Sequence, residues 1–169
     1  MKILETDRLL IRQLTVDDAN FILELLNDPS FIQNIGDRNV RTVEDAKAYV
    51  LNGPVASYAK NGFGLSLVIL KATGESIGMC GLIKRDVFED VDIGYAYLPR
   101  YWTKGYAIEA ALAMKSYAKE TVRLNRLVAI VDPANTGSIR VLEKLGMKFE
   151  KMIRLSQDDI ELKFFACDL

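Results

Sequence analysis

Residues 101–110, which read Tyr-Trp-Thr-Lys-Gly-Tyr-Ala-Ile-Glu-Ala, combine the parts of an anion-binding turn. A strand-like run precedes them and a helix-like run follows them. The first backbone N–H groups of a helix have no internal partner, and the helix dipole adds positive potential there. Lys104 adds a cation, and Gly105 has no Cβ to hold a bound group away from the backbone. The segment therefore predicts a site for a phosphate-bearing ligand, with an ordinary strand-to-helix turn as the alternative.

Missing residue types limit the chemistry. The chain has no histidine, which excludes Ser-His-Asp and Cys-His catalysis and His-ligated metals. Its two cysteines, Cys80 and Cys167, form no CxxC pair, so we expect no metal site. Both lie in apolar runs and read as core residues, with a nucleophilic Cys80 as the less favoured alternative. An acid or base must therefore come from carboxylate, Tyr, Lys, Ser or water.

Composition is that of a folded domain without a strong electrostatic bias. The chain has 169 residues, of which 50% are hydrophobic, and a formal net charge of −1 from 22 basic and 23 acidic residues. This length favours a single domain over residues 1–169. The charge balance predicts no nucleic-acid or acidic-membrane partner. No membrane-length apolar run and no signal-peptide core are present, so we expect a cytoplasmic protein.

Alternating strands and helices are expected to position the turn. Apolar runs and turn residues predict strands, and helical periodicity with capping residues predicts helices, including a capping box at 42–45. The pattern is that of one α/β (α+β) domain, with a hairpin early and a βαβ unit late. The expected strands are 9–14, 63–70, 76–84, 91–98, 127–131, 148–155 and 160–168, and the expected helices are 18–27, 42–60, 107–122 and 137–145.

Four motifs in this order resemble the GNAT N-acetyltransferase superfamily, and within it the RimJ/RimL-like branch of ribosomal-protein N-acetyltransferases. They are Thr6–Arg12, Ile93–Tyr95, Tyr101–Ala110 and Asn135–Gly146. The resemblance covers essentially the whole chain. It implies the GNAT fold: a mixed, mostly antiparallel sheet of about seven strands, splayed between the fourth and fifth strands and flanked by about four helices.

The resemblance implies acetyl-CoA as co-substrate, lying between strands 91–98 and 127–131 with its pyrophosphate on the turn. Thr103 stands where the family usually has Gly. If the turn needs a positive φ there, the β-branched side chain costs about 1–3 kcal/mol. The residues that the resemblance assigns to the coenzyme are Leu98, Trp102, Thr103, Lys104, Gly105, Tyr106, Ala107, Ile108, Asn135, Ser138, Arg140 and Lys144.

Amine acetylation needs a base, an oxyanion donor and an acid for the leaving thiolate. The resemblance points to Asp92 as the base, with Glu109 second, because the simplest role of Glu109 is to complement the helix dipole. It places the oxyanion donor at a backbone N–H near residues 97–98. Ser138 is the expected donor to sulfur, since Leu142 stands where many members have Tyr.

The sequence therefore predicts an acetyl-CoA-dependent N-acetyltransferase that works by direct attack in a ternary complex. The acceptor is a primary amine, either a protein N-terminus or a small molecule. A catalytically weak acyl-CoA-binding module is the alternative, motivated by Thr103 and the missing Tyr. Loops Phe31–Asn39 and Arg85–Asp90 are expected to select the acceptor, and the protein is expected to be a monomer or a homodimer.

Overall fold

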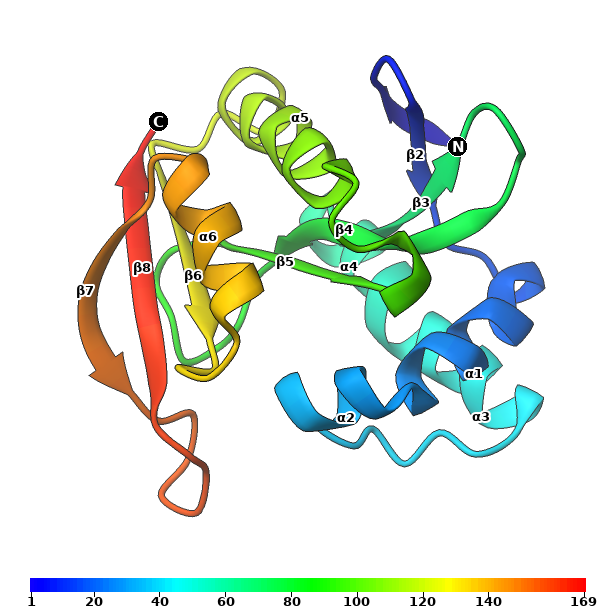
Figure 1. Ribbon diagram of the computed structural model, residues 1–169, viewed down its shortest axis with the longest axis horizontal. Coiled ribbons are helices and arrows are strands. Elements are labelled where there is room, and N and C mark those ends of the chain that lie inside the picture. The colour runs from blue at the N-terminus through cyan, green and yellow to red at the C-terminus, as the bar shows by residue number, and fades with distance from the viewer.

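A computed structural model describes residues 1–169 and shows one eight-stranded sheet in the order β1-β2-β3-β4-β5-β6-β8-β7 (Figure 1). All neighbouring strands are antiparallel except β5 and β6, which confirms the mixed, mostly antiparallel sheet. The predicted count of about seven missed β1, a four-residue strand paired with β2. The strands are β1 (Lys2–Glu5), β2 (Leu9–Gln13), β3 (Leu65–Leu70), β4 (Ser76–Ile83), β5 (Asp92–Tyr97), β6 (Arg126–Val131), β7 (Lys148–Ile153) and β8 (Leu162–Asp168).

The helices match the expected positions with two corrections. A short helix that was not expected, α2, begins at Pro29, and Asp28 caps it by accepting from the Ser30 N–H. The expected helix 42–60 is divided by a π-helical turn at Leu51–Val55, where Pro54 lacks the N–H that a regular helix requires. The helices are α1 (Ala19–Asn27), α2 (Pro29–Asn34), α3 (Val43–Val50), α4 (Ala56–Asn61), α5 (Tyr106–Glu120) and α6 (Thr136–Lys144).

The sheet opens between β5 and β6. These parallel strands share one register pair, Asp92 with Val128, beside a hydrogen bond of 3.0 Å from the Val128 N–H to the Val91 carbonyl. β5 and β6 are the strands that the sequence analysis placed fourth and fifth, so the predicted splay is confirmed. The gap widens toward the carboxyl ends of both strands, where the turn before α5 lies.

Helices cover both faces of the sheet (Figure 1). α5 packs on β4 and β5 from one face, and Tyr95 on β5 points to that face, toward α6. The other face carries Arg12, whose guanidinium binds Asp18 before α1 at 2.8 Å. The register across β2 to β5 places Asp92 on the Arg12 face. The two faces at the splay therefore present different chemistry.

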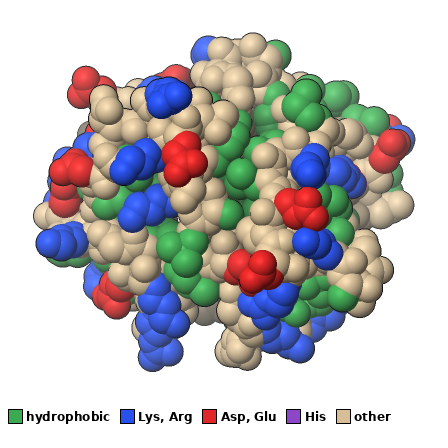
Figure 2. Space-filling model, turned by 90° about the horizontal axis from the view of Figure 1, so that it is seen from above, with side chains coloured by type: hydrophobic (Ala, Val, Ile, Leu, Met, Phe, Trp, Pro, Cys, Tyr) green, Lys and Arg blue, Asp and Glu red, His purple; other side chains and the backbone are tan.

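Surface charge follows the balanced composition. Over the face seen from above in Figure 2, basic and acidic side chains are interspersed, with apolar side chains between them. No helix combines the length and the hydropathy that crossing a bilayer would require.

Candidate functional site

The turn before α5 leaves a run of backbone donors free. Gly105 takes φ +84° as the N-cap residue, and the first backbone hydrogen bond of the helix runs from the Glu109 N–H to the Gly105 carbonyl at 3.1 Å. The N–H groups from Thr103 to Ile108 donate to no acceptor in the chain. Lys104 is exposed and forms no ion pair. The turn therefore presents free N–H groups at a helix start, beside a hollow of about 560 Å³.

Thr103 adopts the left-handed conformation, with φ +62°. Its hydroxyl donates to the Trp102 carbonyl at 2.6 Å, which fixes the side chain beside the turn. A β-branched residue in this region carries strain of about 1–3 kcal/mol. The condition that the sequence analysis attached to Thr103 is therefore met.

Replacing Thr103 with Gly should stabilise the protein. Relief of strain exceeds the extra entropy that Gly loses on folding, so the expected net gain is about 1 kcal/mol and Tm rises by about 2–4 °C. Thermal unfolding followed by circular dichroism measures this. Thr121→Gly is the matched control, because Thr121 has φ −98° and no left-handed strain to relieve. Equal Tm changes in the two variants would show that Thr103 is unstrained.

A clamp of Thr6, Arg8 and Glu109 holds this turn against the N-terminal hairpin. The Arg8 Nε donates to the Glu109 carboxylate at 2.6 Å, and its Nη1 donates to the Lys104 carbonyl at 2.9 Å. The Thr6 hydroxyl donates to the same carboxylate at 2.6 Å. Burial raises the pKa of Glu109, but the hydrogen bonds from Thr6 and Arg8 outweigh this effect, and the net result is a lowered pKa. The Glu109 carboxylate is thus ionised and already bound by Thr6 and Arg8. Arg8 was not among the expected site residues, although the motif Thr6–Arg12 contains it.

On the α6 side of the gap, two hydroxyl groups meet. The Tyr95 and Ser138 hydroxyl oxygens lie 2.9 Å apart. Asn135 caps α6 by accepting from the Ser138 N–H at 3.2 Å. Burial raises the pKa of Tyr95, so this phenol is protonated at neutral pH. Leu142 is buried in the core, and Tyr95 supplies from β5 a phenol that α6 lacks.

Backbone hydrogen bonds exclude one of the two N–H groups expected to stabilise the oxyanion. The Leu98 N–H donates to the Ile77 carbonyl on β4 at 3.1 Å, which removes it from the candidates. Strand alternation turns the Tyr97 backbone toward the gap instead. The Trp102 indole donates to the Tyr97 carbonyl at 2.9 Å, although the residue as a whole is 45% exposed. The Tyr97 N–H is therefore the remaining candidate of the pair.

Asp92 lies at the closed end of the splay with one oxygen free. The residue is 2% exposed; its Oδ2 accepts from the Arg85 Nε at 2.7 Å, and its Oδ1 has no partner. Burial raises the pKa of this carboxyl, against the opposing effect of Arg85. A buried carboxylate with an unused oxygen is suited to accept a proton.

Other expected residues are placed as follows. Arg140 and Lys144 are exposed on α6 and form no ion pair, so both are available to a ligand. Loop Arg85–Asp90 is partly committed to structure, since Asp90 forms an ion pair with Arg126 at 3.2 Å. Cys80 is fully buried, and burial raises its pKa to about 12. A thiolate nucleophile at Cys80 is therefore disfavoured.

Comparison with known proteins identifies the family. The family model described as "Acetyltransferase (GNAT) domain" matches residues 8–148. A protein of Bacillus licheniformis, "Uncharacterized N-acetyltransferase p20", is 31% identical over 157 residues, covering 91% of this chain and 86% of the relative. The match to YkkB of Bacillus subtilis is 40% identical over 99 residues and spans 56% of this chain and 58% of YkkB, an uncharacterized protein.

Solved structures share the whole fold. A GNAT-family acetyltransferase from Bacillus anthracis is 29% identical and superposes with a TM-score of 0.81, covering 99% of this chain and 98% of that one. RimL, a ribosomal L7/L12 α-N-protein acetyltransferase solved with coenzyme A, superposes with a TM-score of 0.84 over 100% of this chain and 98% of its own. At 14% identity, RimL shows likeness of fold alone.

Proposed function

The chain belongs to the GNAT acetyltransferase family, and we propose that it moves the acetyl group of acetyl-CoA directly to a primary amine. One observation carries the proposal. The turn with free N–H groups, Thr103 to Ile108, stands at the open end of a gap between β5 and β6, and Asp92 stands at the closed end. A coenzyme held by its pyrophosphate at the turn can reach along β5 toward the carboxylate.

The turn and α6 would hold the coenzyme. The N–H groups of the first turn of α5 bind the pyrophosphate, and Lys104 adds charge. Arg140 and Lys144 are within one helical turn of each other on α6 and supply further cations for the phosphates. Asn135, already the cap of α6, contacts the pantetheine arm. Glu109 acts as a positioning residue through Arg8, not as a base.

The reaction needs three proton movements. An amine with a pKa of about 8–10 is mostly protonated at neutral pH, so Asp92 Oδ1 accepts a proton before the amine attacks. The C–N bond then forms and the C–S bond breaks, while the Tyr97 N–H stabilises the oxyanion. The nitrogen loses its second proton to solvent as the amide forms, while Ser138 donates a proton to the leaving sulfur and recovers one from solvent through Tyr95. No covalent enzyme intermediate is formed, consistent with the burial of Cys80.

Ser138→Ala and Tyr95→Phe test whether these hydroxyl groups protonate the leaving sulfur. Each should lower kcat by about tenfold, the low end of proton-transfer catalysis, with little change in acetyl-CoA affinity. Because the hydroxyls act in series, the double variant should lose little more than either single variant. Steady-state kinetics measures this, with Ser116→Ala on the exposed face of α5 as the control. Full activity in both single variants would contradict the assignment.

Turnover separates this proposal from its alternative. Release of the free coenzyme A thiol is followed over a panel of primary amines, small molecules and peptide N-termini, after acetyl-CoA binding is measured by calorimetry. Turnover of any amine supports the transferase. Binding without turnover favours a catalytically weak acyl-CoA-binding module, which the strain at Thr103 motivates. No binding at all would refute both.

Four broader assignments belong to the same proposal. Residues 1–169 act as one catalytic domain, since the strands form a single sheet. The chain lies in the RimJ/RimL-like branch, supported by the motif Thr6–Arg12, which anchors the turn through Arg8. The protein works in the cytoplasm as a monomer or homodimer. Gel filtration at several concentrations tests the oligomeric state.

A further inference from the structure

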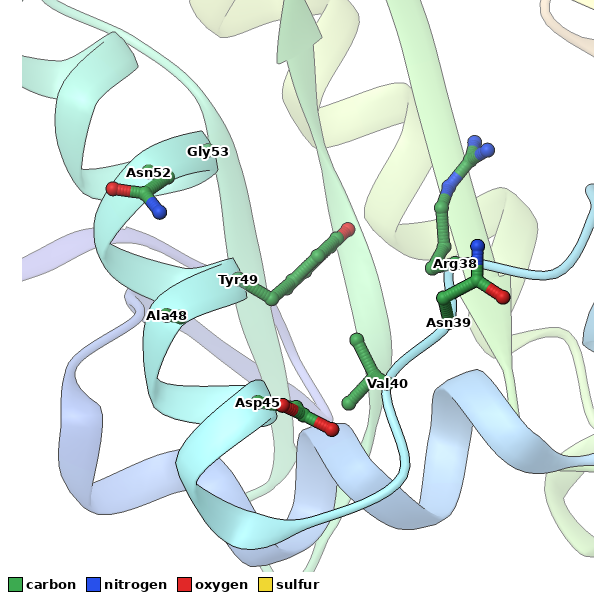
Figure 3. Close-up of a pocket in the computed structure, with 8 residues that line it drawn as sticks. All are labelled: Arg38, Asn39, Val40, Asp45, Ala48, Tyr49, Asn52 and Gly53. Atoms are coloured by element: carbon green, nitrogen blue, oxygen red, sulfur yellow. The ribbon is translucent and has the colours of Figure 1, made fainter.

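A polar pocket of about 390 Å³ lies between α3 and the loop that joins α2 to α3 (Figure 3). Its size suits a small molecule, for which protein pockets hold about 300–1,000 Å³. In Figure 3 the Tyr49 side chain projects from α3 across the pocket toward the loop. The lining residues are Arg38, Asn39, Val40, Asp45, Ala48, Tyr49, Asn52 and Gly53.

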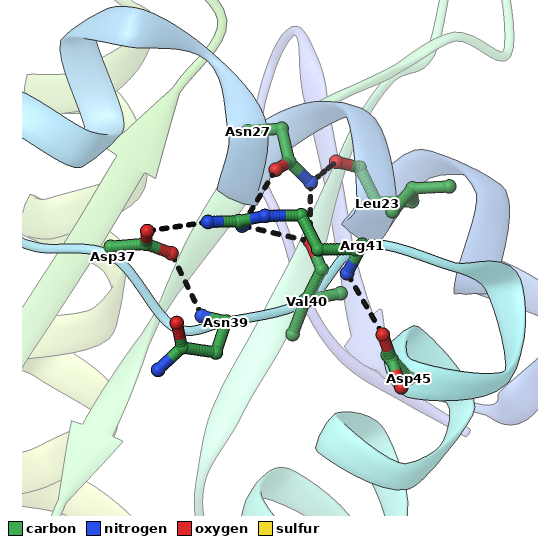
Figure 4. Close-up of polar contacts among 7 residues, drawn as sticks. All are labelled: Leu23, Asn27, Asp37, Asn39, Val40, Arg41 and Asp45. Atoms are coloured by element: carbon green, nitrogen blue, oxygen red, sulfur yellow. Dashed lines mark hydrogen bonds and ion pairs between the residues drawn. The ribbon is translucent and has the colours of Figure 1, made fainter.

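The loop carrying Arg38 is held in place by its own hydrogen bonds (Figure 4). The Arg41 guanidinium donates to Asp37 at 2.5 Å and to the Asn27 side chain at 3.1 Å. The Asn27 amide in turn donates to the Val40 carbonyl at 2.8 Å. Arg41 is therefore committed to building the loop, which pre-organises whatever else the loop presents.

Arg38, three residues earlier, is committed to nothing. It forms no hydrogen bond or ion pair with the chain, and it lines the pocket. The one acidic lining residue, Asp45, is occupied as a helix cap, accepting from the Arg41 and Thr42 N–H groups. Asn39 and Asn52 contribute uncharged amides. The pocket thus offers a free guanidinium and neutral donors, which is the composition of a site for an oxyanion.

The pocket lies on the same side of the sheet as the carboxylate that we propose as base, because α3 packs on α1 and on the turn of Asp18, which binds Arg12 on the Asp92 face. The charges of Arg38 and Arg85 both act on the Tyr49 hydroxyl, and Arg85 binds Asp92. The Tyr49 hydroxyl is therefore near both the free cation and the Arg85–Asp92 pair. A ligand held by Arg38 would extend past Tyr49 toward Asp92 Oδ1.

We infer that the acceptor is a small primary amine that also carries an anionic oxygen group, a carboxylate or a phosphonate, bound by Arg38. This inference rests on the proposed function and names the substrate class of the same site. Arg38 holds the anion, the Tyr49 hydroxyl donates to it, and the amine at the other end points toward Asp92. A peptide N-terminus without a nearby anion would lack this anchor.

The test compares matched acceptors. Acetylation rates are measured for a series of α- and ω-amino acids, for aminoalkyl phosphonates, and for neutral alkylamines and diamines of the same lengths. The wild type should prefer the anionic members by about tenfold or more in kcat/KM. Arg38→Ala should remove this preference by raising KM, with Arg38→Lys restoring part of it. Lys60→Ala on α4 removes a positive charge outside the pocket and should leave the preference intact.

The outcomes separate the two proposals. Equal rates for anionic and neutral amines, unchanged in Arg38→Ala, would overturn the anion site while leaving the transferase standing. Preference for diamines or for peptide N-termini would overturn it too. If no amine is acetylated, the anion site is tested by calorimetry, in which the same carboxylates and phosphonates are titrated into the protein loaded with acetyl-CoA. Binding that Arg38→Ala abolishes upholds the site without the transferase, and no binding overturns it.

Discussion

Replacing Asp92 with Asn should lower kcat by about 100-fold while acetyl-CoA binds as before. General base catalysis contributes on the order of 10²- to 10⁴-fold, and Asn cannot accept the proton that the buried Oδ1 is free to take. Because burial raises the pKa of Asp92, the wild-type kcat should fall at low pH through a pKa above the ordinary Asp value of about 3.9. That acidic limb should be missing from the variant.

Two other carboxylates give this experiment its controls. Asp17 is exposed and makes no side-chain contact, so Asp17→Asn makes the same chemical change without an expected effect. Glu109→Gln should raise the KM for acetyl-CoA and leave kcat nearly unchanged, because it loosens Arg8 and the turn. If Glu109→Gln instead removed the acidic limb and Asp92→Asn retained it, the roles of base and positioning residue would be exchanged. Steady-state rates measured across pH give kcat and KM for each variant, and calorimetry gives its affinity for acetyl-CoA.

The splay and the turn were predictable because local signals and the resemblance agreed on them. The signals for these elements are local: a strand-like apolar run at 91–98, a Gly at 105, and helical periodicity directly after it. The division of helix 42–60 was not foreseen, although Pro54 signals it, because the capping box at its start favoured a continuous helix. Local patterns predict elements better than their interruptions.

Long-range partners were beyond the sequence. The clamp of Arg8 on Glu109 joins residues about a hundred positions apart, and nothing in the local pattern of either residue names the other. The same holds for Tyr95 and Ser138, which meet only because β5 and α6 face one gap. Strand alternation places Tyr95 and Asp92 on opposite faces of β5, but it cannot supply the partner of Tyr95 on α6.

Gly105→Val should weaken acetyl-CoA binding by about 100-fold or more. Position 105 has φ +84°, which a β-branched residue adopts only with strain, and a Cβ there would lie 3.2 Å from the Arg8 Nη2. The chain relieves both problems by shifting the start of α5, which turns the free N–H groups away from the pyrophosphate. Loss of two or three hydrogen bonds to a charged group accounts for the expected magnitude.

Gly62→Val is the control that distinguishes loss of the coenzyme site from the general effect of backbone strain. Gly62 has φ +80° at the end of α4, and a Cβ added there would meet no atom within 4 Å, so its substitution imposes the same backbone strain away from the coenzyme. Both variants should lose similar Tm, and only Gly105→Val should lose affinity by calorimetry. The milder Gly105→Ala serves if the Val variant fails to fold. A Gly105 variant that binds acetyl-CoA as well as Gly62→Val would place the pyrophosphate elsewhere, since the turn would then be an ordinary strand-to-helix connection.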